Sequence, residues 1–109
     1  MKTSEIKFSV KLDENNLPID IKWEAQDQKE KGECKSVLIS IWDKNEKNTL
    51  KIDLWTKDMM VDDMKRFFHQ SMISMADTFK RATGEEKIAE DMKDFCKHFA
   101  QKMELLEKK

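Results

Sequence analysis

Residues 36–55 have the sequence SVLISIWDKNEKNTLKIDLW, and this stretch decides the predicted fold. Apolar and polar residues alternate on both sides of a polar turn at 43–48, as expected for two half-buried antiparallel strands. Pairing Ile39 with Ile52 keeps the apolar side chains of both runs on one face, and a one-residue slip would destroy that match. We therefore predict a β-hairpin with strands at 36–42 and 49–55.

The opposite face of this hairpin is not cleanly polar. It carries Leu38, Trp42 and Trp55 together with Lys51 and Asp53. A solvated sheet face usually carries Thr, Lys or Glu, and Trp is enriched at the energetic centres of protein interfaces. Two interpretations stay open: either the protein's own loops cover these side chains, or the five residues form a protein-contact surface for a second copy of the chain or for another protein.

The residues before this hairpin predict a second hairpin, with strands at 5–12 and 17–24. Apolar residues alternate from Ile6 to Leu12 and from Leu17 to Trp23, on either side of a four-residue DENN loop. Pairing Phe8 with Ile21 places all of these apolar side chains on one face. Residues 25–35 are polar and contain one glycine, so we predict a flexible connection there.

From about Val61 the apolar period changes to 3.6 residues, which is typical of an amphipathic helix. We predict helices at 60–82 and 85–107, which a short break allows to form an antiparallel hairpin. The first apolar stripe comprises Met64, Phe68, Met72, Met75 and Phe79, and the second comprises Ile88, Met92, Phe95, Phe99, Met103 and Leu106. The residues predicted to be nearly inaccessible are Phe8, Ile21, Ile39, Ile52, Phe68, Met75, Phe95 and Phe99.

The predicted fold is therefore α+β, a four-stranded antiparallel meander (ββββ) with a two-helix antiparallel hairpin packed on one face. A chain of 109 residues is long enough for one domain and too short for two. We expect a single domain over residues 1–109, with a β-sheet half at 1–56 and a helical half at 57–109.

Charge and hydropathy exclude several classes of partner. The chain has 21 Lys and Arg against 22 Asp and Glu, and the two signs are interleaved without a basic stripe. We therefore expect no binding to nucleic acid or to anionic membrane surfaces. No apolar run approaches the roughly 20 residues that span a bilayer, and Glu5 and Lys7 interrupt the first apolar stretch. We expect no signal peptide, no direct membrane insertion and a cytoplasmic location.

The sequence contains no motif of a known catalytic or cofactor site: HExxH, a P-loop, GxSxG and a glycine-rich phosphate loop are all missing. His69 and His98 would lie level across the helical hairpin, with Asp94 one turn before His98. Both histidines are offset to the same side, so only one can face the groove between the helices. We predict no catalytic residue, no cofactor and no metal site, and we expect Cys34 and Cys96 to be reduced thiols.

Two stretches resemble a known family. Residues 40–70, SIWDKNEKNTLKIDLWTKDMMVDDMKRFFHQ, and residues 75–86, MADTFKRATGEE, are similar to the gliding motility protein GldC family of the Bacteroidota. The opening MKTSEIKFSVKLDENNLP fits as well, so the resemblance covers nearly the whole chain.

The resemblance implies a non-enzymatic accessory protein of the gliding motility machinery, which binds a protein partner of that apparatus on the cytoplasmic side. It implies no catalytic residue and no ligand. The alternative is a small chaperone-like protein for exported or assembling components, because the ββββαα order also resembles the export chaperone SecB. That alternative is an analogy of fold alone.

Overall fold

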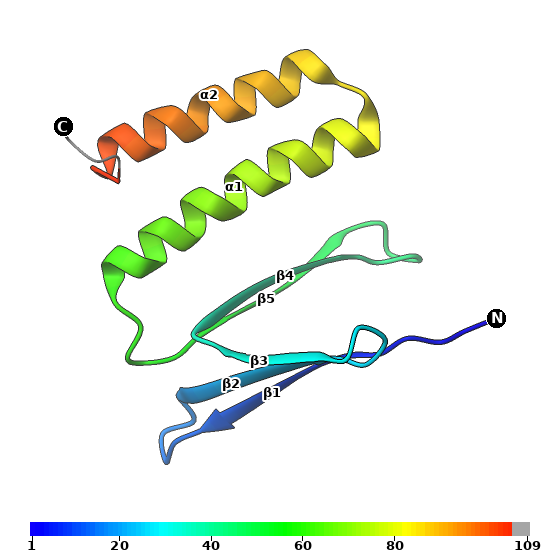
Figure 1. The fold of residues 1–109 in the computed structure, drawn as a ribbon, viewed down its shortest axis with the longest axis vertical. Helices are drawn as coiled ribbons and strands as arrows, with labels where there is room; N and C mark the ends of the chain where they lie inside the picture. Colours follow the sequence, from blue (N-terminus) through cyan, green and yellow to red (C-terminus); the bar gives the residue numbers. More distant parts are fainter. Residues whose placement is uncertain (106–109) are drawn as a thin grey trace. The chain divides into compact units, whose positions relative to one another are not determined.

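The computed structural model describes residues 1–105, in which five strands are followed by two helices (Figure 1). The chain divides into two compact units, residues 1–59 and the part that begins at Met60, and each unit is described by itself. The first unit contains the strands and the second contains the helices. The α+β class is therefore confirmed.

The strands of the first unit form two antiparallel sheets. β1 (Ile6–Leu12), β2 (Pro18–Ala25) and β3 (Glu30–Cys34) form a three-stranded sheet in the order β1-β2-β3, whereas β4 (Ser36–Trp42) and β5 (Thr49–Trp55) form a two-stranded sheet. The prediction of one four-stranded meander is wrong, because the segment 25–35 contains a strand and is not a flexible connection.

The register of β2 and β3 places residues of opposite charge across from each other. The register pairs three consecutive residues of β2 with three of β3: Lys22 with Glu33, Trp23 with Gly32, and Glu24 with Lys31. Opposite charges that face each other across two strands stabilise the pairing. These residues lack an alternating apolar pattern, so hydrophobic periodicity alone gives no sign of the strand.

Trp23 lies directly over Gly32. A Cβ atom added at Gly32 would lie 2.9 Å from Nε1 of Trp23 and 3.1 Å from its Cε2. Both distances are shorter than ordinary van der Waals contacts, so the indole occupies the space that a side chain at position 32 would need. Glycine at this position therefore lets the indole pack against the backbone of β3.

The register of the first hairpin differs from the predicted one by two residues. Phe8 faces Trp23, and Ile21 faces Val10. The N–H of Asp13 donates to the carbonyl of Leu17 at 2.9 Å, so the loop that this bond closes has three residues, 14–16, instead of the predicted four. Asn16 in this loop takes a left-handed conformation with φ 63°. A bulge next to Leu12 shifts the pairing by one residue more. From Ile6 to Lys11 the shift is two residues, which keeps the side chains of this part of the hairpin on their predicted faces.

The second hairpin confirms both its predicted bounds and its predicted register, since Ile39 faces Ile52. Its four-residue loop closes with the N–H of Asp43 donating to the carbonyl of Asn48 at 2.9 Å. The carboxylate of Asp43 also accepts the N–H of Asn45 at 3.0 Å. The turn therefore has the length that the alternating pattern requires.

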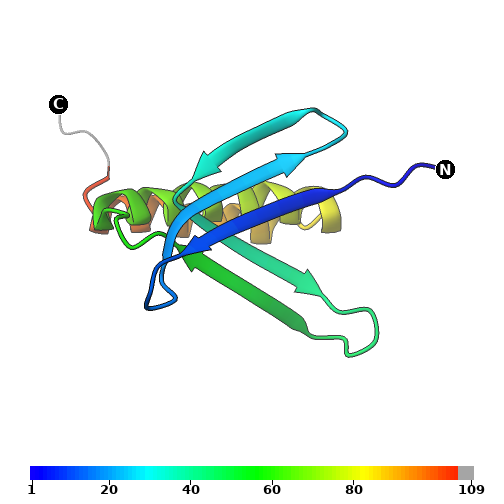
Figure 2. The ribbon, with the colours of Figure 1, turned by 90° about the horizontal axis from the view of Figure 1, so that it is seen from below.

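The two sheets meet at a sharp corner. Lys35 alone separates β3 from β4, and its carbonyl accepts the N–H of Thr56 at 2.7 Å. Just beyond Thr56, the N–H of Lys57 donates to the carbonyl of Pro18 at 2.9 Å. Figure 2 shows β3 ending and β4 beginning at this corner, from which the two sheets diverge. The corner therefore ties the end of β5 to both sheets.

The second unit is an antiparallel helical hairpin, as predicted, made of α1 (Val61–Thr83) and α2 (Glu86–Lys102). Gly84 ends α1 in the left-handed conformation, with φ 76°, and donates its N–H to the carbonyl of Lys80 at 2.8 Å. α2 ends before the predicted residue 107. Leu106 and the predicted end of that helix lie outside the described residues.

Most of the buried apolar residues have smaller side chains than the residues predicted to be buried. Ile21 is fully buried, as expected, and the other buried apolar residues are Ala76, Ala89, Cys96 and Ala100. The prediction of near-inaccessibility is wrong for Phe8, Ile52, Phe68, Met75 and Phe95, which are exposed, and Met75 is 61% exposed. It is also wrong for Ile39 and Phe99, which are only partly buried. Two helices alone bury only the residues along their line of contact, and small side chains at that line allow a close approach.

The predicted packing of the helical hairpin on a sheet face stays a prediction, since each unit is described by itself. The single domain over residues 1–109 also stays a prediction.

We expect Gly32→Ala to lower the free energy of unfolding by about 1–3 kcal/mol, because the new methyl group would overlap the Trp23 indole. Chemical denaturation monitored by circular dichroism measures this loss. The matched control is the same substitution in a Trp23→Leu background, where the smaller side chain removes the overlap. An equal loss in both backgrounds would show that Gly32 does not accommodate Trp23.

Candidate functional site

The five residues of the predicted contact surface lie on one face of the β4–β5 hairpin. Neighbouring strands pair Ser36 with Trp55, Leu38 with Asp53, Ser40 with Lys51, and Trp42 with Thr49. We call these eight residues the contact face. It contains one tryptophan at each end, on different strands, with an oppositely charged pair in the middle.

The side chains of both tryptophans of the contact face are exposed to solvent. Trp42 is 67% exposed and Trp55 is 54% exposed. Between them, Nζ of Lys51 lies 3.2 Å from Oδ1 of Asp53, so the two charged side chains form an ion pair along β5. The contact face thus combines exposed aromatic area with a charged pair, and Trp is enriched among the residues that contribute most to binding at protein interfaces. Binding at this face stays a prediction.

The five predicted contact residues leave out three members of the contact face. Ser36, Ser40 and Thr49 each pair directly with one of the predicted residues. The register of the hairpin was correctly predicted, so the same pairing could have identified them. These three side chains are small, so they leave space on the face beside the larger Trp42, Lys51 and Trp55.

The other face of the same hairpin is apolar as well. Ile41, Leu50 and Ile52 are each about half exposed. An isolated two-stranded hairpin is only marginally stable in water unless an apolar face packs against other structure. The hairpin therefore has two faces on which packing or binding would be favourable.

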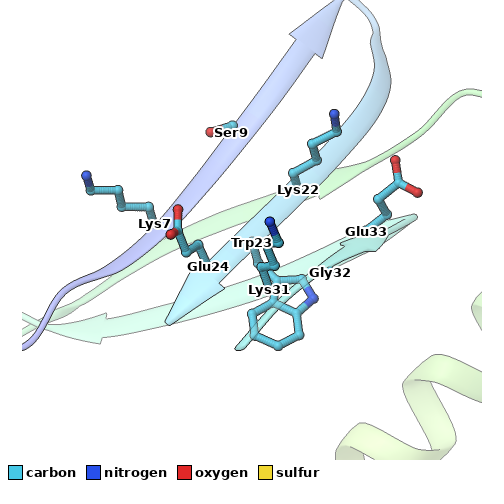
Figure 3. A pocket seen from close by; sticks show the side chains of 8 residues that line it. All are labelled: Lys7, Ser9, Lys22, Trp23, Glu24, Lys31, Gly32 and Glu33. Carbon is cyan, nitrogen blue, oxygen red and sulfur yellow. The ribbon is translucent and has the colours of Figure 1, made fainter. Parts of the chain in front are cut away.

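A broad hollow on the three-stranded sheet, with a volume of about 550 Å³, is lined mainly by charged side chains. Its lining residues are Lys7, Ser9, Lys22, Trp23, Glu24, Lys31, Gly32 and Glu33. In Figure 3, Lys22 and Glu33 point away from the Trp23 indole, so the charged side chains occupy one side of the sheet. Since lysines and glutamates alternate across neighbouring strands, this hollow is the solvated side of the sheet.

A smaller polar hollow of about 270 Å³ lies at the corner between the sheets. Thr56, which is buried, donates its hydroxyl to Oδ1 of Asp58 at 2.7 Å, and Asp58 also lies 3.6 Å from Nζ of Lys35. The bond from Thr56 and the charge of Lys35 lower the pKa of Asp58. Cys34 lines the same hollow, and burial raises the pKa of its thiol. A raised pKa makes the Cys34 thiol a weaker nucleophile at neutral pH than an unperturbed thiol.

The same corner holds the most strongly shifted carboxyl group. Nζ of Lys57 lies 2.8 Å from Oδ2 of Asp13, and the N–H groups of Leu17 and Asn15 donate to Oδ1 of Asp13 at 3.0 and 2.8 Å. The bond from Lys57, followed by those from the backbone, lowers the pKa of Asp13 from 3.8 to about 2. These contacts join the first hairpin loop to the segment after β5.

The two histidines lie in different surroundings. The ring of His69 stacks on Phe99 of the other helix, with centroids 6.2 Å apart and planes 4° apart, whereas His98 lies beside Phe95 of its own helix. Only one histidine therefore faces the neighbouring helix, as predicted. Among residues 1–105, no three His, Cys, Asp or Glu side chains lie close enough together to hold a metal ion.

Cys34 and Cys96 are both free thiols, as expected. Cys96 and Phe95 border a shallow groove of about 240 Å³ on the helical hairpin, together with Met72, Met75 and Met92. The lining of this groove is almost wholly apolar. The thiol of Cys96 and the thioethers of the methionines are the weakly polar groups of its lining.

Within the described part of the chain, neither helix contains a stretch that is long and apolar enough to cross a membrane.

Comparison with known proteins identifies one family. The family model described as "Gliding motility-associated protein GldC-like" matches residues 18–105. The match includes the contact face and both helices. No curated protein and no solved structure matches the chain.

We expect the contribution of Asp13 to stability to disappear in acid. Because its pKa falls from 3.8 to about 2 on folding, the folded chain binds this proton less readily than the unfolded chain. The contribution is therefore complete above about pH 4 and is lost as the pH falls through about 2. The measurement is the difference in Tm between the wild type and Asp13→Asn at neutral pH and near pH 2.

The matched control for this prediction is Asp27→Asn, in the exposed turn between β2 and β3. It should show little difference in Tm at either pH. A difference for Asp13→Asn that stays the same at both pH values would contradict the role assigned to its ionised carboxylate.

Proposed function

The chain belongs to the family of gliding motility-associated GldC-like proteins, and from this membership we propose a specific role. It is a non-enzymatic accessory protein of the gliding motility machinery, which acts by protein–protein binding on the cytoplasmic side. The family associates the chain with gliding motility, and the contact face suggests how it acts.

The observation that carries the proposal is the exposure of Trp42 and Trp55 on one strand-paired face. Full burial of a large apolar side chain is worth about 1.5–3 kcal/mol. Two indoles at the ends of a short face therefore offer a substantial gain to any protein that covers them. The Lys51–Asp53 pair between them supplies the polar contacts that give an interface its specificity.

The shifted pKa values of the carboxyl groups arise from ion pairs and hydrogen bonds. The bond with Lys93, whose Nζ lies 2.7 Å from Oδ1 of Asp77, lowers the pKa of Asp77 and raises that of Lys93. Asp13 and Asp58 are also held in their charged forms by nearby lysines and hydroxyl or backbone donors. A general acid or base needs a pKa close to the working pH. The shifts lower the pKa values of the three aspartates and raise that of Lys93, so each moves further from neutral pH.

The direct test replaces both tryptophans, as Trp42→Thr together with Trp55→Thr. Threonine suits a strand, and the two indoles are exposed, so we expect the free energy of unfolding to change by less than about 1 kcal/mol. We expect the spreading of cells that carry this variant to be lost, because the binding area is removed. Colony spreading and thermal unfolding are the two measurements.

The matched control is Trp23→Thr, which removes the half-buried indole that packs on Gly32. This variant should be less stable, so its effect on spreading indicates what instability alone does. Normal spreading in the variant that lacks Trp42 and Trp55 would contradict the proposed role of the contact face.

A crosslinking pull-down from motile cells identifies what the contact face binds. One stoichiometric partner that is lost with the two tryptophans supports the assembly role. Many unfolded clients would instead support the chaperone-like alternative.

A further inference from the structure

We propose that the contact face binds the same face of a second copy of this chain, forming a two-fold symmetric dimer. The inference rests on the proposed function in that it uses the same face and names its partner. A surface that pairs with itself must be self-complementary about the symmetry axis. The residues of the contact face meet this condition in both charge and size.

The symmetry follows from the register of β4 and β5. The axis lies parallel to the contact face and perpendicular to the strands, midway between the Leu38–Asp53 and Ser40–Lys51 pairs. This rotation reverses the strands, so each end of one face meets the opposite end of the other. The resulting pairs across the interface are Lys51 with Asp53, Leu38 with Ser40, Trp42 with Ser36, and Trp55 with Thr49.

Charge is the first argument for this arrangement. Within one copy, Lys51 and Asp53 already lie 3.2 Å apart along β5. The rotation places the lysine of each copy over the aspartate of the other, so four charges of alternating sign meet at the centre. Opposite charges that face each other across an interface fix its register and disfavour other arrangements.

Size is the second argument. The largest side chains, Trp42 and Trp55, face the small Ser36 and Thr49 of the other copy, and Leu38 faces Ser40. Large side chains opposite small ones let two sheet faces interdigitate, whereas two tryptophans opposite each other would hold the sheets apart. The strands of two packed sheets usually cross at about 30°. Because the face is short, such a crossing moves its end residues only a small distance from their partners.

The other two-fold axis that a sheet face allows runs along the strands, and it fits less well. It would place Lys51 over Ser40 and Asp53 over Leu38, which leaves both charges without an opposite charge in the other copy. Burial of a charge against a group that cannot pair with it is unfavourable. The charges therefore select the axis perpendicular to the strands.

The size of the face sets the expected affinity. Seven residues per strand correspond to a length of ~24 Å, and two strands with their side chains to a width of ~10 Å. An interface of this size lies below the standard range for specific complexes. We therefore expect a weak, reversible dimer with a dissociation constant on the order of micromolar or higher.

The experiment reverses one charge at a time. Lys51→Glu makes the centre of the face wholly negative, and Asp53→Lys makes it wholly positive. Sedimentation over a wide range of concentration should show the wild type in monomer–dimer exchange and each variant at least about tenfold weaker in self-association. An equimolar mixture of the two variants should associate again, because every pair across the axis then joins opposite charges.

The matched controls are Arg66→Glu and Asp63→Lys on α1, where Nη1 of Arg66 lies 3.6 Å from Oδ1 of Asp63. These variants should self-associate like the wild type. Thermal unfolding of every variant verifies that a loss of association is not a loss of folding. A mixture that associates no better than the separate Lys51→Glu and Asp53→Lys chains overturns the proposed symmetry.

The dimer and the proposed function can fail separately. A wild type that stays monomeric at every concentration, while the chain lacking Trp42 and Trp55 still loses spreading, overturns the dimer and supports the proposed function. A wild-type dimer that the tryptophan substitutions abolish without any effect on spreading supports the dimer and overturns the proposed function.

Discussion

The packing of the Trp23 indole on the bare backbone of Gly32 holds the first unit together. It joins β3 to β2 and carries the chain to Lys35, whose carbonyl accepts the N–H of Thr56. The position of β4 and β5, and hence of the contact face, follows from that corner. Without the pairing of β3, residues 25–35 would be a loop, and the corner at Lys35 would lose the strand that leads into it.

The polar contacts of the first unit act on structure more than on chemistry. Asp13, Thr56 and Asp58 bind backbone groups or lysines around the corner, and each is satisfied locally. Their bonds stabilise charged carboxylates, which makes the corner rigid and sensitive to acid. On the contact face, by contrast, the ion pair between Lys51 and Asp53 is the main polar contact within the hairpin. That contrast is why we assign binding to the face and stability to the corner.

The two hairpins show what local pattern can and cannot predict. The hairpin of β4 and β5 was predicted residue by residue, because its four-residue turn agrees with the alternation on both sides. The first hairpin differs by two residues, because Asp13 closes a shorter loop and a bulge follows beside Leu12. Loop closure depends on which backbone groups a carboxylate binds, and period-two alternation does not contain that information.

The sequence by itself determined the α+β class, both helices, the strands of the second hairpin and five of the eight residues of its contact face. These features depend on residues near each other in the chain, where periodicity decides which side chains share a face. Only the tertiary structure decided that β3 exists, that the strands form two sheets, and that the buried residues of the helices include Ala76, Ala89 and Ala100. These features depend on pairings between separate elements, in which opposite charges or small side chains replace the apolar repeat.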